Sequence, residues 1–394
     1  MSDPWLTLIG IGEDGLEGLT PASRAALDRA EIVFGGPRHL ELAQVGARGR
    51  AWPVPFTVAP VLAERGRPVA VLASGDPFWH GAGGSLIPQL AAGEWRSFAG
   101  VSTFALAANR LGWRLEDTLC LGLHAAPLAR LRPVLGHNQR LILLLRDGAA
   151  VAEVAEFLQR HGFGASELWV LQALGGPKES ILKFTAQEIG TQQFATPVAL
   201  AVIARGIGLS RASGLEDTLF EHDGQITRRP VRALTLSALA PRPGDTLWDI
   251  GTGSGSVSIE FLLAAPGSRS IALEADPDRA ARARRNAAGF GLSHRLAVIE
   301  ARAPQGLDGL PRPNVVFVGG GASAALLQAV WAALPAGARL VMNAVTLETE
   351  ALLYAAQASH GGTLMRIDLA EMGPLGTRRG WEPARPVVQW SVAK

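Results

Sequence analysis

Short apolar runs alternate with stretches of helical periodicity along the chain, and this alternation predicts strands and helices in turn. In the first half the expected strands lie at residues 5–9, 31–34, 69–73, 140–145, 167–171 and 197–203. The expected helices there lie at residues 21–30, 105–111 and 149–160. Thr20 provides an N-cap for the first helix and Pro21 its first residue. A strand, a helix and a strand in this order favour a parallel sheet.

The second half continues the pattern. Its expected strands lie at residues 247–250, 270–273, 296–300, 315–321, 340–346 and 386–392, the last of them at a sheet edge. A helix is expected from Pro277 to about residue 289. An earlier one is expected to be capped by Thr227 and to bury Val231, Leu234, Leu236 and Leu239. The glycine-rich, polar stretch 206–214 predicts a linker, so we expect domains at 1–208 and 216–394 joined by 209–215.

Two glycine loops follow strands expected in the first half, and a third glycine turn precedes the helix expected at 105–111. They are Gly10 with Gly12, Gly75 in the run Ser-Gly-Asp-Pro-Phe at 74–78, and Gly100 in the run Gly-Val-Ser-Thr at 100–103. Ligand sites of open parallel sheets lie at the carboxyl ends of strands. The three glycine loops therefore predict one cleft that holds a small ligand.

A denser glycine loop occurs in the second half, where Asp249 precedes Gly251, Gly253 and Gly255 and a helix follows. Such a loop lets a ligand approach the backbone and the free N–H groups of the helix start. Glu274 ends the next strand, where a carboxylate would accept two ribose hydroxyls. The spacing D-x-G-x-G-x-G is typical of S-adenosylmethionine (SAM) methyltransferases with a Rossmann-like fold. A dinucleotide site, which would favour G-x-G-x-x-G, and a ligand-free turn are the alternatives.

Composition narrows the class of protein. The 394 residues indicate two or three domains of about 150 residues each. With 48% apolar and 18% charged residues, a large core is expected and bulk disorder is not. A net charge of +2 without a basic block does not favour nucleic acid as a partner. Cys120 is the one cysteine, so neither a disulfide nor a cysteine metal cluster is expected. No apolar run reaches 18 residues, so we expect no membrane span and a soluble cytoplasmic protein.

Residues 1–206 resemble the tetrapyrrole methylases. The resemblance rests on the three glycine loops and on Leu-Gly-Gly-Pro-Lys-Glu at 174–179. In that family two α/β subdomains hold SAM in a cleft between them. By this resemblance the SAM contacts fall on Gly10, Gly12, Gly75, Asp76, Pro77, Gly100, Ser102 and Thr103. The chain departs from the family at 122–125, which read Gly-Leu-His-Ala where relatives show Ser-Leu-His-Gly. We interpret His124 as a packed or solvent-facing residue rather than a base.

Residues 215–394 resemble the decarboxylating methyltransferase domain of corrin biosynthesis. The matching stretches are Thr227-x-x-x-Val231-Arg232, 249–255, Glu274, 303–304, 317–321 and 343–348. By this resemblance SAM contacts fall on Thr227, Asp249, Gly251, Thr252, Gly253, Ser254, Gly255, Glu274 and Ala303. The fold implied is a tetrapyrrole methylase domain followed by a Rossmann-like methyltransferase domain.

Together the two resemblances, in this order, are similar to the precorrin-6B C(5,15)-methyltransferase (decarboxylating) family. This implies two SAM molecules, one per domain, methylation of a tetrapyrrole at carbons 5 and 15, and decarboxylation to precorrin-8X in cobalamin biosynthesis. The first domain is expected to act on carbon 5 and the second on carbon 15. The resemblance also implies a homo-oligomer. Side chains expected to hold the substrate carboxylates are Arg228, Arg229, Arg232, Asn343, Arg378, Arg379 and Arg385.

Several alternatives stay open at this stage. They are a cobalt-containing substrate, an RNA or protein methyltransferase on the same folds, and a scaffold that binds SAM or tetrapyrrole without turnover. No acid for the decarboxylation is identified, although Glu348, Asn343 and His360 are visible. No metal ligand set is expected.

Overall fold

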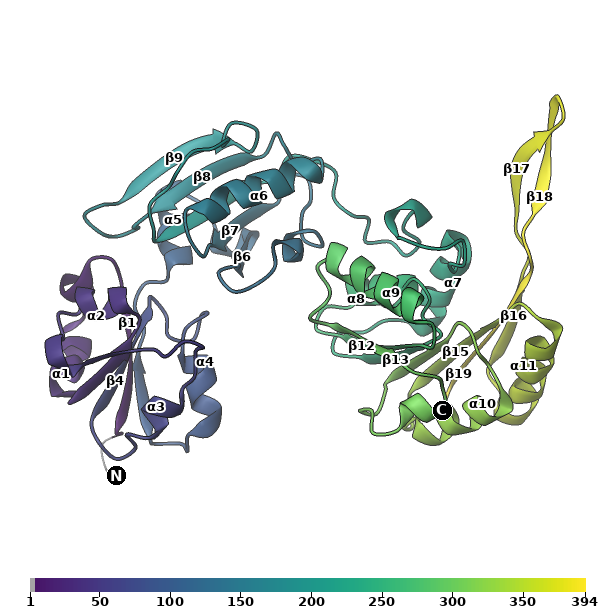
Figure 1. Ribbon diagram of the computed structural model, residues 1–394, viewed down its shortest axis with the longest axis horizontal. Helices are drawn as coiled ribbons and strands as arrows, with labels where there is room; N and C mark the ends of the chain where they lie inside the picture. The colour runs from purple at the N-terminus through teal and green to yellow at the C-terminus, as the bar shows by residue number, and fades with distance from the viewer. Residues whose placement is uncertain (1–3) are drawn as a thin grey trace. The chain divides into compact units, whose positions relative to one another are not determined.

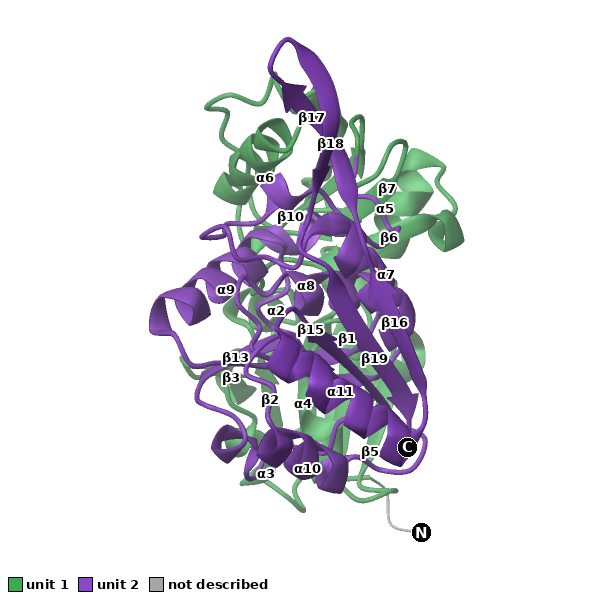
Figure 2. Cartoon of the chain, turned by 90° about the vertical axis from the view of Figure 1, so that its right-hand side faces the viewer, with its two compact units in different colours: residues 1–128, 135–207 green, residues 129–134, 208–394 purple. Residues whose placement is uncertain are grey.

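The computed structural model describes residues 4–394. The chain forms two compact units (Figures 1 and 2). Unit 1 comprises residues 1–128 and 135–207, and unit 2 comprises residues 129–134 and 208–394. The sequence pattern did not predict that 129–134 groups with unit 2. In the described part of the chain, no helix combines the length and the apolar character that a membrane crossing requires.

The first sheet of unit 1 is fully parallel, with the order β3-β2-β4-β1-β5. Its strands are β1 (Leu6–Ile11), β2 (Ile32–Gly35), β3 (Gly49–Ala51), β4 (Val69–Ser74) and β5 (Trp95–Phe98). Its helices are α1 (Pro21–Arg29), α2 (Pro37–Leu42), α3 (Ala59–Leu62) and α4 (Gly83–Leu86). Every residue of β1 is buried, as expected for a central parallel strand covered on both faces. The Thr20 hydroxyl caps α1 by accepting from the Ser23 amide, as predicted.

The second sheet of unit 1 is mostly antiparallel, with the order β6-β7-β10-β8-β9. Only β6 and β7 run parallel among its pairs. Its strands are β6 (Thr118–Gly122), β7 (Arg140–Leu144), β8 (Glu167–Gln172), β9 (Ser180–Thr185) and β10 (Val198–Ile203), and its helices are α5 (Thr103–Leu111) and α6 (Ala149–Arg160). The sequence pattern missed β9, because this edge strand is half exposed and lacks a buried apolar run. Cys120 lies half-buried on β6, and burial raises the pKa of its thiol to about 11.

Unit 2 contains a seven-stranded sheet with the order β13-β12-β11-β14-β15-β19-β16. Its strands are β11 (Thr246–Ile250), β12 (Arg269–Glu274), β13 (Leu296–Glu300), β14 (Val315–Val318), β15 (Arg339–Ala344), β16 (Thr363–Ile367) and β19 (Val387–Ala393). Its helices are α7 (Arg229–Leu239), α8 (Ser256–Ala264), α9 (Pro277–Gly289), α10 (Ala324–Ala333) and α11 (Leu347–His360). The prediction that the last strand lies at the edge was wrong. β19 is paired on both sides, and the edge strand is β16, whose mixed, mostly exposed side chains gave no clear pattern.

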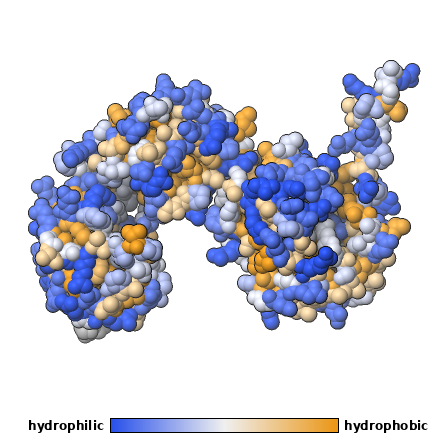
Figure 3. Space-filling view, viewed as in Figure 1, coloured by the Kyte–Doolittle hydropathy of each residue, from blue (hydrophilic) through white to orange (hydrophobic). Residues whose placement is uncertain are grey.

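Two further predictions for unit 2 need correction. Thr227 does not cap α7, because Arg228 occupies the N-cap position and no side chain accepts a bond there. Leu234 is 38% exposed, and the buried face of α7 instead includes Arg232 and Thr235. The hairpin of β17 (Ala370–Leu375) and β18 (Arg378–Pro383) was also not predicted. It extends from unit 2 with apolar and polar side chains at its surface (Figures 1 and 3).

Candidate active sites

The three glycine loops of unit 1 meet one another directly. The Gly100 amide donates to the Gly75 carbonyl at 3.0 Å, and the Gly75 amide donates to the Ile11 carbonyl at 3.1 Å. A Cβ placed on Gly10 would lie 1.7 Å from the Gly75 carbonyl oxygen, so no side chain fits there. Glycine at Gly10 therefore serves the contact between two backbones. Two residues of these contacting loops, Ile11 and Gly75, line a cleft.

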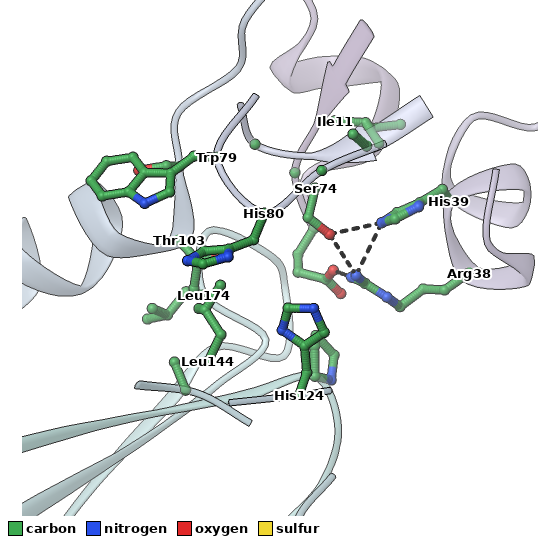
Figure 4. Close-up of a pocket in the computed structure, with 18 of the residues that line it drawn as sticks. Ile11, Arg38, His39, Ser74, Trp79, His80, Thr103, His124, Leu144 and Leu174 are labelled. Carbon is green, nitrogen blue, oxygen red and sulfur yellow. Dashed lines mark hydrogen bonds and ion pairs between the residues drawn. The ribbon is translucent and has the colours of Figure 1, made fainter. Parts of the chain in front are cut away.

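The cleft is a cavity of about 930 Å³ between the strand ends of the first sheet and the second sheet of unit 1 (Figure 4). Four of the residues predicted to contact SAM line it: Gly12, Gly75, Ser102 and Thr103. The other four, Gly10, Asp76, Pro77 and Gly100, do not line it. Asp76 holds its own loop, because its Oδ1 accepts from the Phe78 amide at 2.8 Å. Ser102 also caps α5 by accepting from the Ala105 amide at 3.1 Å.

A polar cluster that the sequence analysis missed lies on the same cavity. Arg38 forms an ion pair with Glu13 and donates to the Ser74 hydroxyl at 3.2 Å. The His39 Nε2 lies 2.8 Å from the same hydroxyl. Dashed lines in Figure 4 mark the contacts of Ser74 with Arg38 and His39. Burial, followed by the charge of Arg38, lowers the pKa of His39 to about 4, so its imidazole is neutral near pH 7. A usable signal existed, because Gly35 ends β2 and Gly36 follows it, so this glycine pair also lies at the carboxyl end of a strand.

The glycine loop of unit 2 connects β11 to α8. Gly251, Gly253 and Gly255 have φ values of +70°, +56° and +77°, a region that side chains other than glycine rarely adopt. Asp249 is 1% exposed. Its Oδ2 accepts from the Thr252 hydroxyl at 2.6 Å and from the Ser258 hydroxyl at 2.5 Å. Asp249 therefore holds the loop in shape, and burial raises the pKa of its carboxyl group.

Glu274 lies beside this loop at the end of β12. Its Oε2 accepts from the Gly253 amide at 2.8 Å, and its Oε1 accepts from the Asp276 amide at 3.0 Å. Each carboxylate oxygen has a second lone pair, which leaves capacity for a pair of ligand hydroxyls. The chain segment before α7 passes nearby, since a Cβ placed on Gly253 would lie 3.8 Å from the Gln225 carbonyl oxygen. This segment leads to Thr227.

The loop residues fit an adenosyl ligand. Within residues 4–394, the buried atoms Asp249 Oδ1 and Ser254 Oγ have no hydrogen-bond partner. A Cβ placed on Gly320 would meet no atom within 4 Å, so the loop after β14 borders open space. Unsatisfied buried polar atoms are rare in folded proteins, and a ligand is one explanation for them. Ala303 is partly buried after β13, with its side chain packed on the core of unit 2.

Arg232 is not available to a substrate, contrary to the prediction. Its side chain is 0% exposed and its Nε donates to Glu260 Oε1 at 2.6 Å. Its Nη1 donates to Asp217 Oδ1 at 2.9 Å and to the Thr227 carbonyl at 2.5 Å, and its Nη2 donates to the Leu215 carbonyl. The guanidinium is thus used within unit 2, and the sequence could not distinguish this buried role from a surface one.

The other predicted substrate contacts are scattered. Arg228 lies 3.7 Å from Asp217, and Arg229 pairs with Glu216, both at exposed positions. Asn343 is half-buried, and its Nδ2 donates to the Thr235 hydroxyl at 2.9 Å while its Oδ1 accepts from Gln389 at 3.0 Å. The remaining three are exposed in or after the hairpin strand β18: Arg378, Arg379 and Arg385.

Helix α11 separates two of the groups considered for proton delivery. Glu348 lies in its first turn, which follows the carboxyl end of β15, the same edge as the glycine loops. His360 lies in its last turn, at the opposite edge, where its ring stacks on Trp331 with centroids 4.0 Å apart. His360 is therefore remote from the strand ends and is removed from consideration.

Comparison with known proteins places this geometry in a family. Residues 6–190 match the family of tetrapyrrole (corrin/porphyrin) methylases, and residues 218–394 match a precorrin methyltransferase domain. A Sinorhizobium protein named precorrin-6Y C(5,15)-methyltransferase [decarboxylating] is 48% identical over 99% of this chain and 97% of its own. This chain belongs to the precorrin-6Y C(5,15)-methyltransferase (decarboxylating) family. The expected fold class, a tetrapyrrole methylase fold joined to a Rossmann-like methyltransferase fold, is confirmed.

Two further relatives extend the comparison. A protein of the same name from Mycobacterium tuberculosis (strain CDC 1551 / Oshkosh) is 40% identical over 99% of this chain and 100% of its own. A probable cobalt-precorrin-6B C(15)-methyltransferase (decarboxylating) from Saccharolobus solfataricus is 34% identical over 34% of this chain and 71% of its own. The precorrin-6Y C(5,15)-methyltransferase family thus matches this chain along nearly its whole length. The shorter relative matches about a third of it.

Proposed function

We propose that this chain transfers two methyl groups from SAM to carbons 5 and 15 of a precorrin and removes the carboxyl group of the ring C acetate side chain. The observation that carries the proposal is the 48% identity to a protein of that name over nearly all of both chains. The resemblance of the sequence motifs implies precorrin-6B as the substrate, and the relatives' names give precorrin-6Y. The product is precorrin-8X, as the resemblance implies.

We further propose one SAM site in each unit. In unit 1 the cavity beside Gly12, Gly75, Ser102 and Thr103 supports this assignment. In unit 2 the support is the positive-φ glycine loop, the two unpartnered buried oxygens and Glu274. Bound SAM supplies a methyl group that its sulfonium already activates. The residues of the chain then have to orient the acceptor carbon and exclude water.

The names of the relatives support a division of labour between the units. A protein that matches about a third of this chain is named for carbon 15 and decarboxylation alone. A polypeptide of smaller size therefore combines these two steps in that relative. We propose that unit 2 methylates carbon 15 and decarboxylates, and that unit 1 methylates carbon 5. Glu348 lies at the strand-end edge of unit 2 and is the acid we would substitute first.

The proposal is tested by incubating the whole chain with SAM and a precorrin-6B substrate and measuring the mass of the product by mass spectrometry. We expect two added methyl groups, the loss of one CO2 and two molecules of S-adenosylhomocysteine. A cobalt-containing substrate, incubated in parallel, distinguishes the version of the reaction named for the Saccharolobus relative. No release of S-adenosylhomocysteine from either substrate would contradict the enzyme assignment and favour a scaffold that binds without turnover.

Substitution of Asp76 tests the role of unit 1. Asp76→Ala removes the acceptor that holds the Phe78 amide, so the loop beside the cavity loosens. A hydrogen bond to a charged group contributes about 1.5–3 kcal/mol, so we expect carbon 5 methylation to fall roughly 10- to 100-fold. Methylation at carbon 15 should stay unchanged, as followed by nuclear magnetic resonance of the product. The control is Asp28→Ala on the exposed face of α1, and equal loss at both carbons would contradict the division of labour.

A homo-oligomer, as implied by the resemblance, is also proposed. The support is the hairpin of unit 2, which exposes Met372, Leu375 and Trp381 at 59%, 69% and 75%. Exposed apolar groups on one element favour burial against another surface. Light scattering of the whole chain should give a multiple of its mass, and a monomer mass would contradict this.

A further inference from the structure

Two histidines line the cavity of unit 1 together (Figure 4). His80 follows the loop that begins at Gly75, and His124 follows the end of β6. Their ring centroids are 6.0 Å apart, and the ring planes are nearly perpendicular at 83°. Within residues 4–394, neither imidazole forms a hydrogen bond to a protein group, so their nitrogens stay available to a bound molecule.

The backbone of His80 is in an unusual conformation. Its φ is +61°, in the left-handed region that few residues other than glycine adopt. Such conformations cost free energy and tend to occur at functional sites, where the surrounding structure enforces them. The neighbouring residues do so here, since the Phe104 ring packs against the His80 ring with centroids 6.0 Å apart.

Gly122 provides the space for the His80 ring. A Cβ placed on Gly122 would lie 2.8 Å from His80 Nδ1 and 2.9 Å from Cε1, closer than real contacts allow. The absent side chain and the ring of His80 are therefore one structural feature, which places His80 beside His124.

The electrostatic setting favours the neutral form of His124. Burial lowers the pKa of His124, and the neighbouring His80 lowers it further. The other ionisable groups that line the cavity are occupied. Glu13 pairs with Arg38, His39 contacts Ser74, and Arg146 pairs with Asp147 and Glu153. A neutral imidazole with an available lone pair is suited to accept a proton.

We propose that His124 accepts the proton displaced from the carbon that unit 1 methylates, and that His80 positions its ring. This rests on the proposed function. A ring carbon that bears hydrogen attacks the methyl group with its π electrons, so the carbon–sulfur bond breaks and a carbon–carbon bond forms. The carbon then loses its hydrogen as a proton, and the electrons of that C–H bond restore the double bond. The proton passes to a ring nitrogen of His124 and from there to solvent.

Replacement of His124 tests the proton transfer. In the whole chain, His124→Gln and His124→Asn should slow methylation at carbon 5 by roughly 100- to 10,000-fold, the range for loss of a general base. With substrate deuterated at carbon 5, both variants should show a primary isotope effect, because proton removal has become rate-limiting. Methylation at carbon 15 should be unchanged. His137→Gln, on the exposed surface of unit 1 away from the cavity, is the matched control.

The outcomes separate this proposal from the function on which it rests. No methylation by the unsubstituted chain would defeat the proposed function. The base assignment alone would be overturned if the unsubstituted chain methylates carbon 5 and the His124 variants do so equally fast. The same holds if the variants differ only by a higher KM. Calorimetric titration of each variant with SAM establishes that the cavity is still formed. Two different substitutions are used so that a folding defect in one does not decide the result.

His80 is tested by a measurement that does not depend on turnover. In His80→Gln, the pKa of His124, followed by NMR titration of its ring, should rise because the neighbouring imidazole no longer lowers it. The acidic limb of the pH profile for carbon 5 methylation should move to higher pH, since the neutral base is then lost sooner as pH falls. Gly122→Ala, which displaces the His80 ring, should also raise the pKa of His124, and the effects of the two changes together should not add. An unchanged pKa for His124, or full additivity, would overturn the positioning role.

Discussion

Calorimetric titration of Glu274→Ala with SAM should report one binding site per chain in place of two. Glu274 accepts the Gly253 and Asp276 amides and has lone pairs left for two ribose hydroxyls. Each hydrogen bond to a charged group contributes about 1.5–3 kcal/mol, so losing two should weaken the unit 2 site roughly 100- to 10,000-fold. The dissociation constant of the unit 2 site would then exceed the SAM concentrations used in a normal titration. The unit 1 site should keep its affinity.

Glu221→Gln is the matched control for this experiment. Glu221 also belongs to unit 2, but its carboxylate is exposed and pairs with Arg285 at 2.9 Å. This variant should retain two sites. Two sites of unchanged affinity in Glu274→Ala would contradict the assignment of SAM to the loop at Gly251–Gly255. Carbon 15 methylation and decarboxylation should be lost together in Glu274→Ala only if methyl transfer precedes loss of CO2.

Unit 2 should lose about 3–5 kcal/mol of stability in Arg232→Met, the range for removing one partner of a buried ion pair. The substitution leaves Glu260, with a side chain 3% exposed, as an uncompensated buried charge. Glu260 would keep the Gly214 and Leu215 amides at 2.6 Å and 2.9 Å, which limits the loss without removing it. Hydrogen exchange read by mass spectrometry should show faster exchange in the strands of unit 2 and no change in unit 1.

Arg285→Met provides the comparison for this effect. Its ion pair with Glu221 is more than half exposed on both sides, and exposed pairs contribute little. This control should leave exchange in unit 2 unchanged. If Arg232→Met exchanges like the control, the guanidinium is not the anchor that the structure indicates. A defect in substrate affinity without loss of stability would restore the original interpretation of Arg232 as a carboxylate ligand.

Buried parallel strands were the most predictable part of this fold. β1, β4, β11 and β14 are short, mostly apolar runs, because helices or loops cover both faces of their sheets. Half-exposed strands were missed because polar residues interrupt them, so they form no continuous apolar run. β9, β16 and the hairpin strands carry mixed side chains, and their positions depend on partners that are distant in sequence.

The sites were predictable where glycine spacing reflects backbone geometry. The loop at Gly251–Gly255 and the three loops of unit 1 are of this kind. The roles of charged residues were not predictable, because the sequence does not show which group an arginine pairs with. Arg232 is buried against Glu260, 28 positions away, and Arg38 and His39 meet Ser74 only through the order of strands in the sheet. His124 was assigned to packing because its neighbour His80 lies 44 positions earlier, which no local pattern connects.

Gly10 of unit 1 and Gly320 of unit 2 should differ in their tolerance to substitution. At Gly10 a single added carbon would strike the Gly75 carbonyl, whereas at Gly320 it would enter open space. Consider a library with every substitution at each position, selected first for protein abundance and then for catalytic activity. Substitutions of Gly10 should be lost in both selections. Substitutions of Gly320 should be retained in the selection for abundance and lost only in the selection for activity. The contrast would separate, without any ligand present, glycines that hold the architecture from glycines that leave room for chemistry.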